Sequence, residues 1–199
     1  MRHMILATIG VLACAWPALA QNRPPTAPTR DVLVTYRATG PGQAQPQDIR
    51  VAFTASGNLM RVEGMGGPGG GAYVVVDWTT RRMVMVMPQD RRYMEMPAND
   101  AFTHGFILND SMTFARRGSE TVAGLKCTLW EVTSKEGAGT ACMTDDGVLL
   151  RGRGNDGKGG IEATSVKYGP QPAALFKPPA DYSKLEMPAG APGGRAPGR

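Results

Sequence analysis

The sequence is short of the side chains on which most catalytic and metal sites depend. Its 199 residues include only two His and three Cys, and the one His beyond the first twenty residues is His104. A Ser-His-Asp arrangement would have to use that His, and no Gly-x-Ser-x-Gly motif is present. The carboxylates Glu131, Asp145 and Asp146 are scattered, which favours solvated or turn roles over acid–base chemistry. We therefore expect no enzyme activity, no cofactor and no metal site.

Aromatic residues and a dense basic face are also lacking. Aromatics make up 7% of the chain, and the formal net charge is +5. Basic pairs such as Arg81-Arg82 and Arg116-Arg117 recur, but neighbours in a strand point to opposite faces and so form no single patch. Nucleic-acid binding needs a clustered basic face with aromatics for stacking, so we exclude that function class. Peripheral contact with an anionic membrane fits this charge, at on the order of 1 kcal/mol per well-placed Lys or Arg.

The first twenty residues predict an export signal. A short basic start, Met1-Arg2-His3, precedes an apolar run over residues 4–15 that is too short to span a bilayer. Ala18-Leu19-Ala20 then offers the small residues that signal peptidase recognises. We expect a signal peptide over residues 1–20, cleavage after Ala20 and a periplasmic protein. The alternative is a lipoprotein, with lipid attached to Cys14 at the loose box Val11-Leu12-Ala13-Cys14.

Only Cys127 and Cys142 remain after that cleavage. A pair of Cys in an exported protein predicts a disulfide. Closing a loop of this length contributes on the order of 3 kcal/mol if the bond acts through chain entropy. Two buried free thiols are the alternative.

The chain is predicted to contain one domain between two disordered ends. Residues 21–30 are polar and rich in Pro, which is typical of a solvated leader, and residues 188–199 form a Gly/Pro/Ala tail without an apolar pattern. The domain is expected over residues 31–187. Gly and Pro together make up about one residue in five of the chain, and this argues against an all-helical fold because both are poor helix formers.

Apolar residues within the domain recur with a period of two, which predicts a mainly antiparallel β structure. A break in this pattern at residues 97–117 indicates short helices or a lid, and residues 171–176 indicate a helical turn. Asp146-Gly147 carries a hairpin signal. The Gly-rich residues 64–71 lack the Gly-Lys-Ser/Thr ending of a phosphate loop and predict a long hairpin loop. The expected strands are residues 31–39, 48–55, 58–63, 72–78, 82–87, 91–96, 125–134, 139–144, 148–153 and 160–168.

Methionine is concentrated in two of the expected strands. Met83, Met85 and Met87 alternate along one strand, and Met94 and Met96 alternate along the next, so a hairpin would place all five on one face. Three interpretations remain open: core packing, a soft apolar surface for a variable hydrophobic ligand, and a copper(I) site, because thioethers are soft ligands. The lack of a neighbouring His and of a Met-x-x-Met repeat speaks against copper.

Three stretches resemble a family of small exported bacterial proteins of unknown function. They are the Met-rich hairpin at residues 81–96, the segment GSETVAGLKC at residues 118–127 and the segment FKPPADYSKL at residues 176–185. Proteins of this kind are similar to the LolA-like superfamily of outer-membrane lipoprotein carriers. The resemblance implies a curved antiparallel sheet, a half-barrel, with one or two short helices covering a concave face that accepts acyl chains.

We expect non-catalytic periplasmic binding or carriage of a lipid or another apolar ligand, such as a lipoprotein acyl chain. The alternative is a structural or envelope-stress interaction module that contacts an envelope protein and binds no small molecule. The Met side chains would line the ligand wall, and three Phe side chains would act as a lid. The expected ligand-binding residues are Met83, Met85, Met87, Met94, Met96, Phe102, Phe106 and Phe114.

Overall fold

The computed structural model describes residues 23–40, 45–55, 58–64, 71–98, 108, 111–135, 137–157 and 159–186. These residues form strands and two short 3-10 turns. The 3-10 turns are η1 (Pro88–Asp90) and η3 (Ala173–Phe176). The strands are β1 (Val32–Thr39), β2 (Gln47–Phe53), β3 (Leu59–Glu63), β4 (Tyr73–Asp77), β5 (Arg82–Met87), β6 (Arg92–Pro97), β7 (Thr113–Val122), β8 (Leu125–Ser134), β9 (Gly137–Met143), β10 (Leu149–Gly154), β11 (Gly160–Tyr168) and β12 (Ser183–Lys184).

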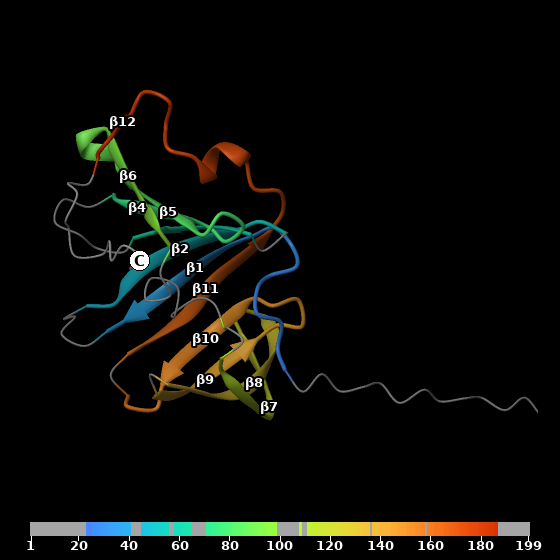
Figure 1. The fold of residues 1–199 in the computed structure, drawn as a ribbon. Helices are drawn as coiled ribbons and strands as arrows, with labels where there is room; N and C mark the ends of the chain where they lie inside the picture. The colour runs from blue at the N-terminus through green and yellow to red at the C-terminus, as the bar shows by residue number, and fades with distance from the viewer. Residues whose placement is uncertain are drawn as a thin grey trace, which may run out of the picture.

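All the described strands belong to one open, curved sheet of twelve strands. Their order is β12-β6-β5-β4-β3-β2-β1-β11-β10-β9-β8-β7, which Figure 1 shows from top to bottom. Every neighbouring pair is antiparallel except β12 and β6. The predicted mainly-β fold with a curved antiparallel sheet is confirmed. Over the part of the chain that the structure describes, no helix has the length and apolar character to span a membrane.

The main core lies on the face of the sheet that carries Val32, Val34 and Tyr36 of β1, all fully buried. Alternate residues of β1 share this face, as the period-two pattern predicts. The core also includes Cys127 and Cys142, so the β8–β9 end of the sheet packs into the same cluster. Its most buried members elsewhere are Val51, Met60, Val62, Val76, Met83, Val148 and Leu150.

The opposite face of β2–β5 is covered by the end of the domain, residues 170–186, which we call the C-terminal strap. Phe176 of η3 is buried there against a cluster that includes Tyr73 and Val86. The guanidinium of Arg61 lies 3.5 Å from the centre of the Tyr73 ring and donates a hydrogen bond of 2.8 Å to the carbonyl of Leu175. The strap then adds β12 beside β6 (Figure 1). The helical turn predicted at residues 171–176 is thus confirmed.

Irregular pairing at three places bends the sheet. The register shifts between Thr35 and Tyr36 of β1, between Leu149 and Arg151 of β10, and between Arg116 and Gly118 of β7. A bulge inserts an unpaired residue and increases the local twist. Glycine allows further close approach: a Cβ at Gly160 would lie 2.6 Å from the carbonyl oxygen of Gly152.

Two expectations from the sequence need correction. Residues 97–117 were expected to be short helices or a lid, but the end of this segment, from Thr113, belongs to β7. The side chains of β7 are mostly exposed because it is an edge strand, so it lacks an apolar alternation. Residues 99–107, 109 and 110 of the same segment lie outside the described residues. The leader was expected to be disordered, but residues 23–30 lie against the sheet with Pro24 and Pro28 buried. Phe102, Phe106 and the loop at residues 65–70 lie outside the described residues.

Candidate functional site

A groove of about 590 Å³ lies over β8–β11, and we call it the β8–β11 groove. Leu149 and Ala141 form part of its floor and are themselves buried. Arg153 and Asp156 lie at its rim. The volume falls within the range of about 300–1,000 Å³ typical of small-molecule sites. The apolar lining consists of Leu108, Met112, Val132, Ala141, Leu149 and Ile161.

Glycine shapes one side of this groove. Gly152 is paired with Ile161 and Ala141 on the neighbouring strands, and a Cβ at Gly152 would make ordinary contacts of 3.6 Å with Ile161 and Leu149. The absence of a side chain at Gly152 therefore leaves open space above the floor. A second groove of about 610 Å³ shares Arg153 and the Gly159-Gly160 edge and is bordered by Arg37.

The floor of the β8–β11 groove belongs to a cluster that is separate from the main core. Ala141 and Leu149 of the floor alternate along β9 and β10 with Cys142 and Leu150 of the main core, so at these strands the floor points away from that core. Met83 lies in the main core, in a row of paired residues that crosses the sheet from β1 through Val32, Phe53, Met60, Val76, Met83 and Met96.

The five methionines of the predicted ligand wall come together in the β5–β6 hairpin. Met83 pairs with Met96, and Met85 pairs with Met94. Met83 is 0% exposed and belongs to the core, whereas Met85 and Met96 are half-buried and pack against it. Met87 and Met94 are also half-buried. The register thus places these side chains on the face of the main core, with one of them fully enclosed.

Of the three predicted lid residues, the structure describes Phe114. Its ring meets the Trp130 ring edge-on, with 6.4 Å between centroids, and both belong to the cluster beside the groove. Phe114 therefore lies near the groove and not beside the Met hairpin. Phe102 and Phe106 lie in the segment that the structure leaves undescribed.

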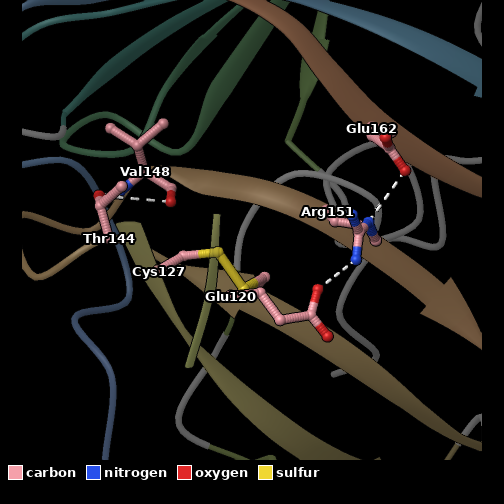
Figure 2. The surroundings of a disulfide bond; sticks show 7 residues. Glu120, Cys127, Thr144, Val148, Arg151 and Glu162 are labelled. Atoms are coloured by element: carbon pink, nitrogen blue, oxygen red, sulfur yellow. Dashed lines mark hydrogen bonds and ion pairs between the residues drawn. A yellow bond between two sulfur atoms is a disulfide. The ribbon is translucent and has the colours of Figure 1, made fainter. Parts of the chain in front are cut away.

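Cys127 and Cys142 form the predicted disulfide (Figure 2). Beside it, Arg151 forms ion pairs with Glu120 and with Glu162, the latter at 2.9 Å. Arg153 approaches the same Glu162 carboxylate at 3.0 Å. This network joins β7, β10 and β11, so together with the disulfide it fixes the strands that form the groove floor.

Two tyrosines have altered acidity for physical reasons visible in the fold. The Tyr36 hydroxyl donates a buried hydrogen bond of 2.7 Å to the carbonyl of Leu149, and burial raises the pKa of Tyr36. Burial also raises the pKa of Tyr168, and its hydrogen bond of 3.1 Å to Asp146 adds to the shift. Both hydroxyls therefore keep their protons to a higher pH than an ordinary tyrosine and act as structural donors.

The described residues contain no group of three or more His, Cys, Asp or Glu side chains that could hold a metal ion. The groove itself was missed by sequence reasoning, because Met112, Gly152 and Ile161 come from separate elements and carry no common motif. The glycines at residues 152–160 are the only signal in the sequence that could have indicated an unfilled face.

The comparison with solved structures supports the fold. A conserved protein from Thermus thermophilus matches with a TM-score of 0.55 and 14% identity, over 79% of this chain and 90% of that one. A chain of the Pseudomonas aeruginosa MucA/MucB complex matches with a TM-score of 0.50 and 13% identity, over 79% of this chain and 59% of that one. This chain thus spans less than two thirds of the latter.

A LolA superfamily protein from Nitrosomonas europaea also matches, at a TM-score of 0.36 and 13% identity, over 79% of this chain and 93% of that one. That score is too low to support an argument. No curated protein matches the sequence. A family of unknown function matches residues 44–154, more than half of the chain. The predicted resemblance to such a family is confirmed, and the chain belongs to the family described as Domain of unknown function (DUF4412).

Proposed function

We propose that the protein binds a lipid or another apolar chain in the β8–β11 groove, without catalysis, in the periplasm. The observation that carries this proposal is an open groove of about 590 Å³ with the apolar side chains of Leu149, Ile161 and Val132 in its lining. Each buried methylene contributes ~0.8 kcal/mol, so an acyl chain of ordinary length gains enough to bind. The disulfide fits an oxidising compartment.

The half-buried methionines form a second apolar surface at the β5–β6 hairpin. Met85 and Met96 pack at the edge of the main core. Unbranched thioether side chains adapt to ligands of different shape. We assign them a secondary role in the proposal, as a deformable margin for longer or branched chains, while Met83 serves the core.

Native mass spectrometry with added fatty acid or phospholipid tests the proposal. The wild-type chain is expected to take up one ligand. Gly152→Val, which adds a side chain above the groove floor, is expected to weaken uptake at least tenfold while the melting temperature stays close to that of the wild type. Thr121→Val on exposed β7 is the matched control and is expected to bind like the wild type.

Two results would overturn the proposal. One is a folded wild-type protein that takes up no added lipid. The other is equal uptake by the wild type and by Gly152→Val, since the ligand would then lie elsewhere.

A second candidate function is binding of an envelope protein. The long edge strand β7 has no strand on its outer side among the described residues, and an edge of this kind can pair with an extended peptide. MucB, which shares the fold, was crystallised in complex with MucA(peri). Under this alternative no lipid is taken up, and cross-linking from a photoreactive residue at Ser119 of β7 in cells captures a defined envelope protein.

A further inference from the structure

The leader, residues 23–30, runs beside the β8–β10 end of the sheet, where Figure 1 shows it in blue, and borders a groove lined by Arg116, Trp130 and Met143. We propose that this groove, which we call the leader groove, is a peptide-binding site for segments that carry Pro between two Arg, and that the leader is its resident occupant. The site is separate from the proposed lipid function. The sheet contacts the leader through its arginine side chains, its backbone and its prolines.

Both ends of the leader are held by an arginine on an aromatic ring. The Arg23 guanidinium lies 5.2 Å from the centre of the Phe114 ring, and the Arg30 guanidinium lies 4.1 Å from that of Tyr168. Arg30 also approaches the Asp146 carboxylate at 3.7 Å. A guanidinium stacks on an aromatic face and binds a carboxylate, and a lysine would do so less well. The two rings therefore select arginine at a fixed separation.

The leader backbone is recognised at the β9–β10 turn. The Thr29 amide donates a hydrogen bond of 2.9 Å to the carbonyl of Asp146. Gly147, next to it, has a φ of +88°, and a Cβ there would lie 2.3 Å from the carbonyl oxygen of Ala27. Glycine at this position thus serves both the turn and the close approach of the leader.

Proline fills the middle of the leader groove. Pro24 and Pro28 are buried, and Pro24 and Pro25 face Trp130 and Met143 across a remaining space of about 170 Å³. Proline has few conformations to lose on docking, so a Pro-rich segment binds with a small entropic cost. The remaining space shows that the leader does not fill the groove completely.

The contacts are those of an exchangeable ligand. Arg30 remains 61% exposed, and the leader adds no strand to the sheet. The contacts of Arg23, Thr29 and Arg30 are polar or aromatic, and only Pro24 and Pro28 of the leader are buried. A segment of the same chemistry, supplied by a second molecule, meets the same rings and the same turn.

The test uses the full chain and a fluorescent peptide of residues 23–30, RPPTAPTR. In the wild type the tethered leader competes with the peptide. In Arg23→Ala/Arg30→Ala the leader is loosened, and fluorescence anisotropy is expected to show peptide binding at least tenfold tighter than to the wild type. A control peptide with both Arg replaced by Ala is expected to bind at least tenfold more weakly than RPPTAPTR.

A variant of Tyr168, whose ring contacts Arg30, tests whether the peptide binds at the leader groove. Adding Tyr168→Ala to the double variant is expected to weaken peptide binding at least fivefold, while Tyr182→Ala on the opposite face leaves it unchanged. Circular dichroism confirms that each variant is folded. A concentration-dependent dimer that the free peptide dissociates would support the proposal, because the groove then takes the leader of a second copy.

The proposal is overturned if the folded, loosened chain binds RPPTAPTR no better than the alanine peptide. It is equally overturned if binding is unaffected by Tyr168→Ala.

Discussion

At the scale of single residues, burial explains the behaviour of Tyr36. The alternation of β1 predicted that Tyr36 shares a face with Val32 and Val34, and the structure confirms that this face is buried. The partner of its hydroxyl, the carbonyl of Leu149, is 113 residues away and could not be predicted. Alternation tells which way a side chain points, but the atom it meets depends on how distant strands pair.

The raised pKa of Tyr36 predicts a loss of stability at high pH. In the unfolded chain a tyrosine ionises near pH 10, whereas the folded protein retains the proton. Its contribution is therefore fully present below pH 10, and the free energy of unfolding falls as pH rises above that value, by about 1.4 kcal/mol per pH unit for one proton. Urea unfolding at pH 8 and pH 10.5 measures this fall.

In Tyr36→Phe the free energy of unfolding is expected to fall less steeply above pH 10, because one titrating proton has been removed. The variant is also expected to lose about 1 kcal/mol of stability at pH 8, because it cannot form the hydrogen bond to Leu149. An unchanged dependence on pH in this variant would contradict the assignment.

At the scale of elements, the sequence predicted most strands but missed those at the edges. β5, β8 and β11 match the predicted ranges, because one or both of their faces are buried and their alternation is clear. β7 and β12 lie at the two edges of the sheet, where exposure removes that pattern. The turn between β7 and β8 lacks an Asn-Gly or Asp-Gly signal, because its first central residue is alanine.

That turn predicts a pair of opposite effects on stability. Ala123 and Gly124 have φ of 49° and 77°, as in the two-residue turns that suit a hairpin. Ala123→Asn is expected to stabilise the protein by about 0.5 kcal/mol, because Asn tolerates this conformation better. Gly124→Ala is expected to destabilise it by about 1 kcal/mol for the opposite reason. Chemical denaturation of both variants checks the signs, and two changes of the same sign would contradict the turn geometry.

At the scale of the whole molecule, the candidate groove depends on curvature, which no local pattern encodes. The methionine hairpin was predicted correctly as a unit, yet the open space lies over β8–β11. Bulges and close glycines determine where the sheet bends and where it leaves space, and their effect emerges only when the strands are paired. The face of β2–β5 opposite the main core could not be predicted from local patterns either, because the C-terminal strap that covers it comes from a distant part of the chain.

We expect the buried part of the C-terminal strap to contribute to stability and the residues beyond the strap to contribute nothing. Phe176→Ala is expected to lower the free energy of unfolding by about 3 kcal/mol, because it leaves a cavity beside Tyr73 and Val86. A chain ending at Glu186 is expected to keep the stability of the full chain, because the sequence predicts that the tail at residues 188–199 is disordered. Thermal and urea unfolding compare the three proteins. Equal stability of Phe176→Ala and the wild type would show that the strap is not part of the folded unit.

The pairing of β1 with β11 affects the order of events during folding. The Thr164 hydroxyl donates to the carbonyl of Thr35, which is 129 residues earlier in the chain. β1 can pair with β2 soon after synthesis, but its other neighbour, β11, is made only near the end of the domain. Such distant pairing slows folding. Slow folding of this kind suits the export that residues 1–20 predict.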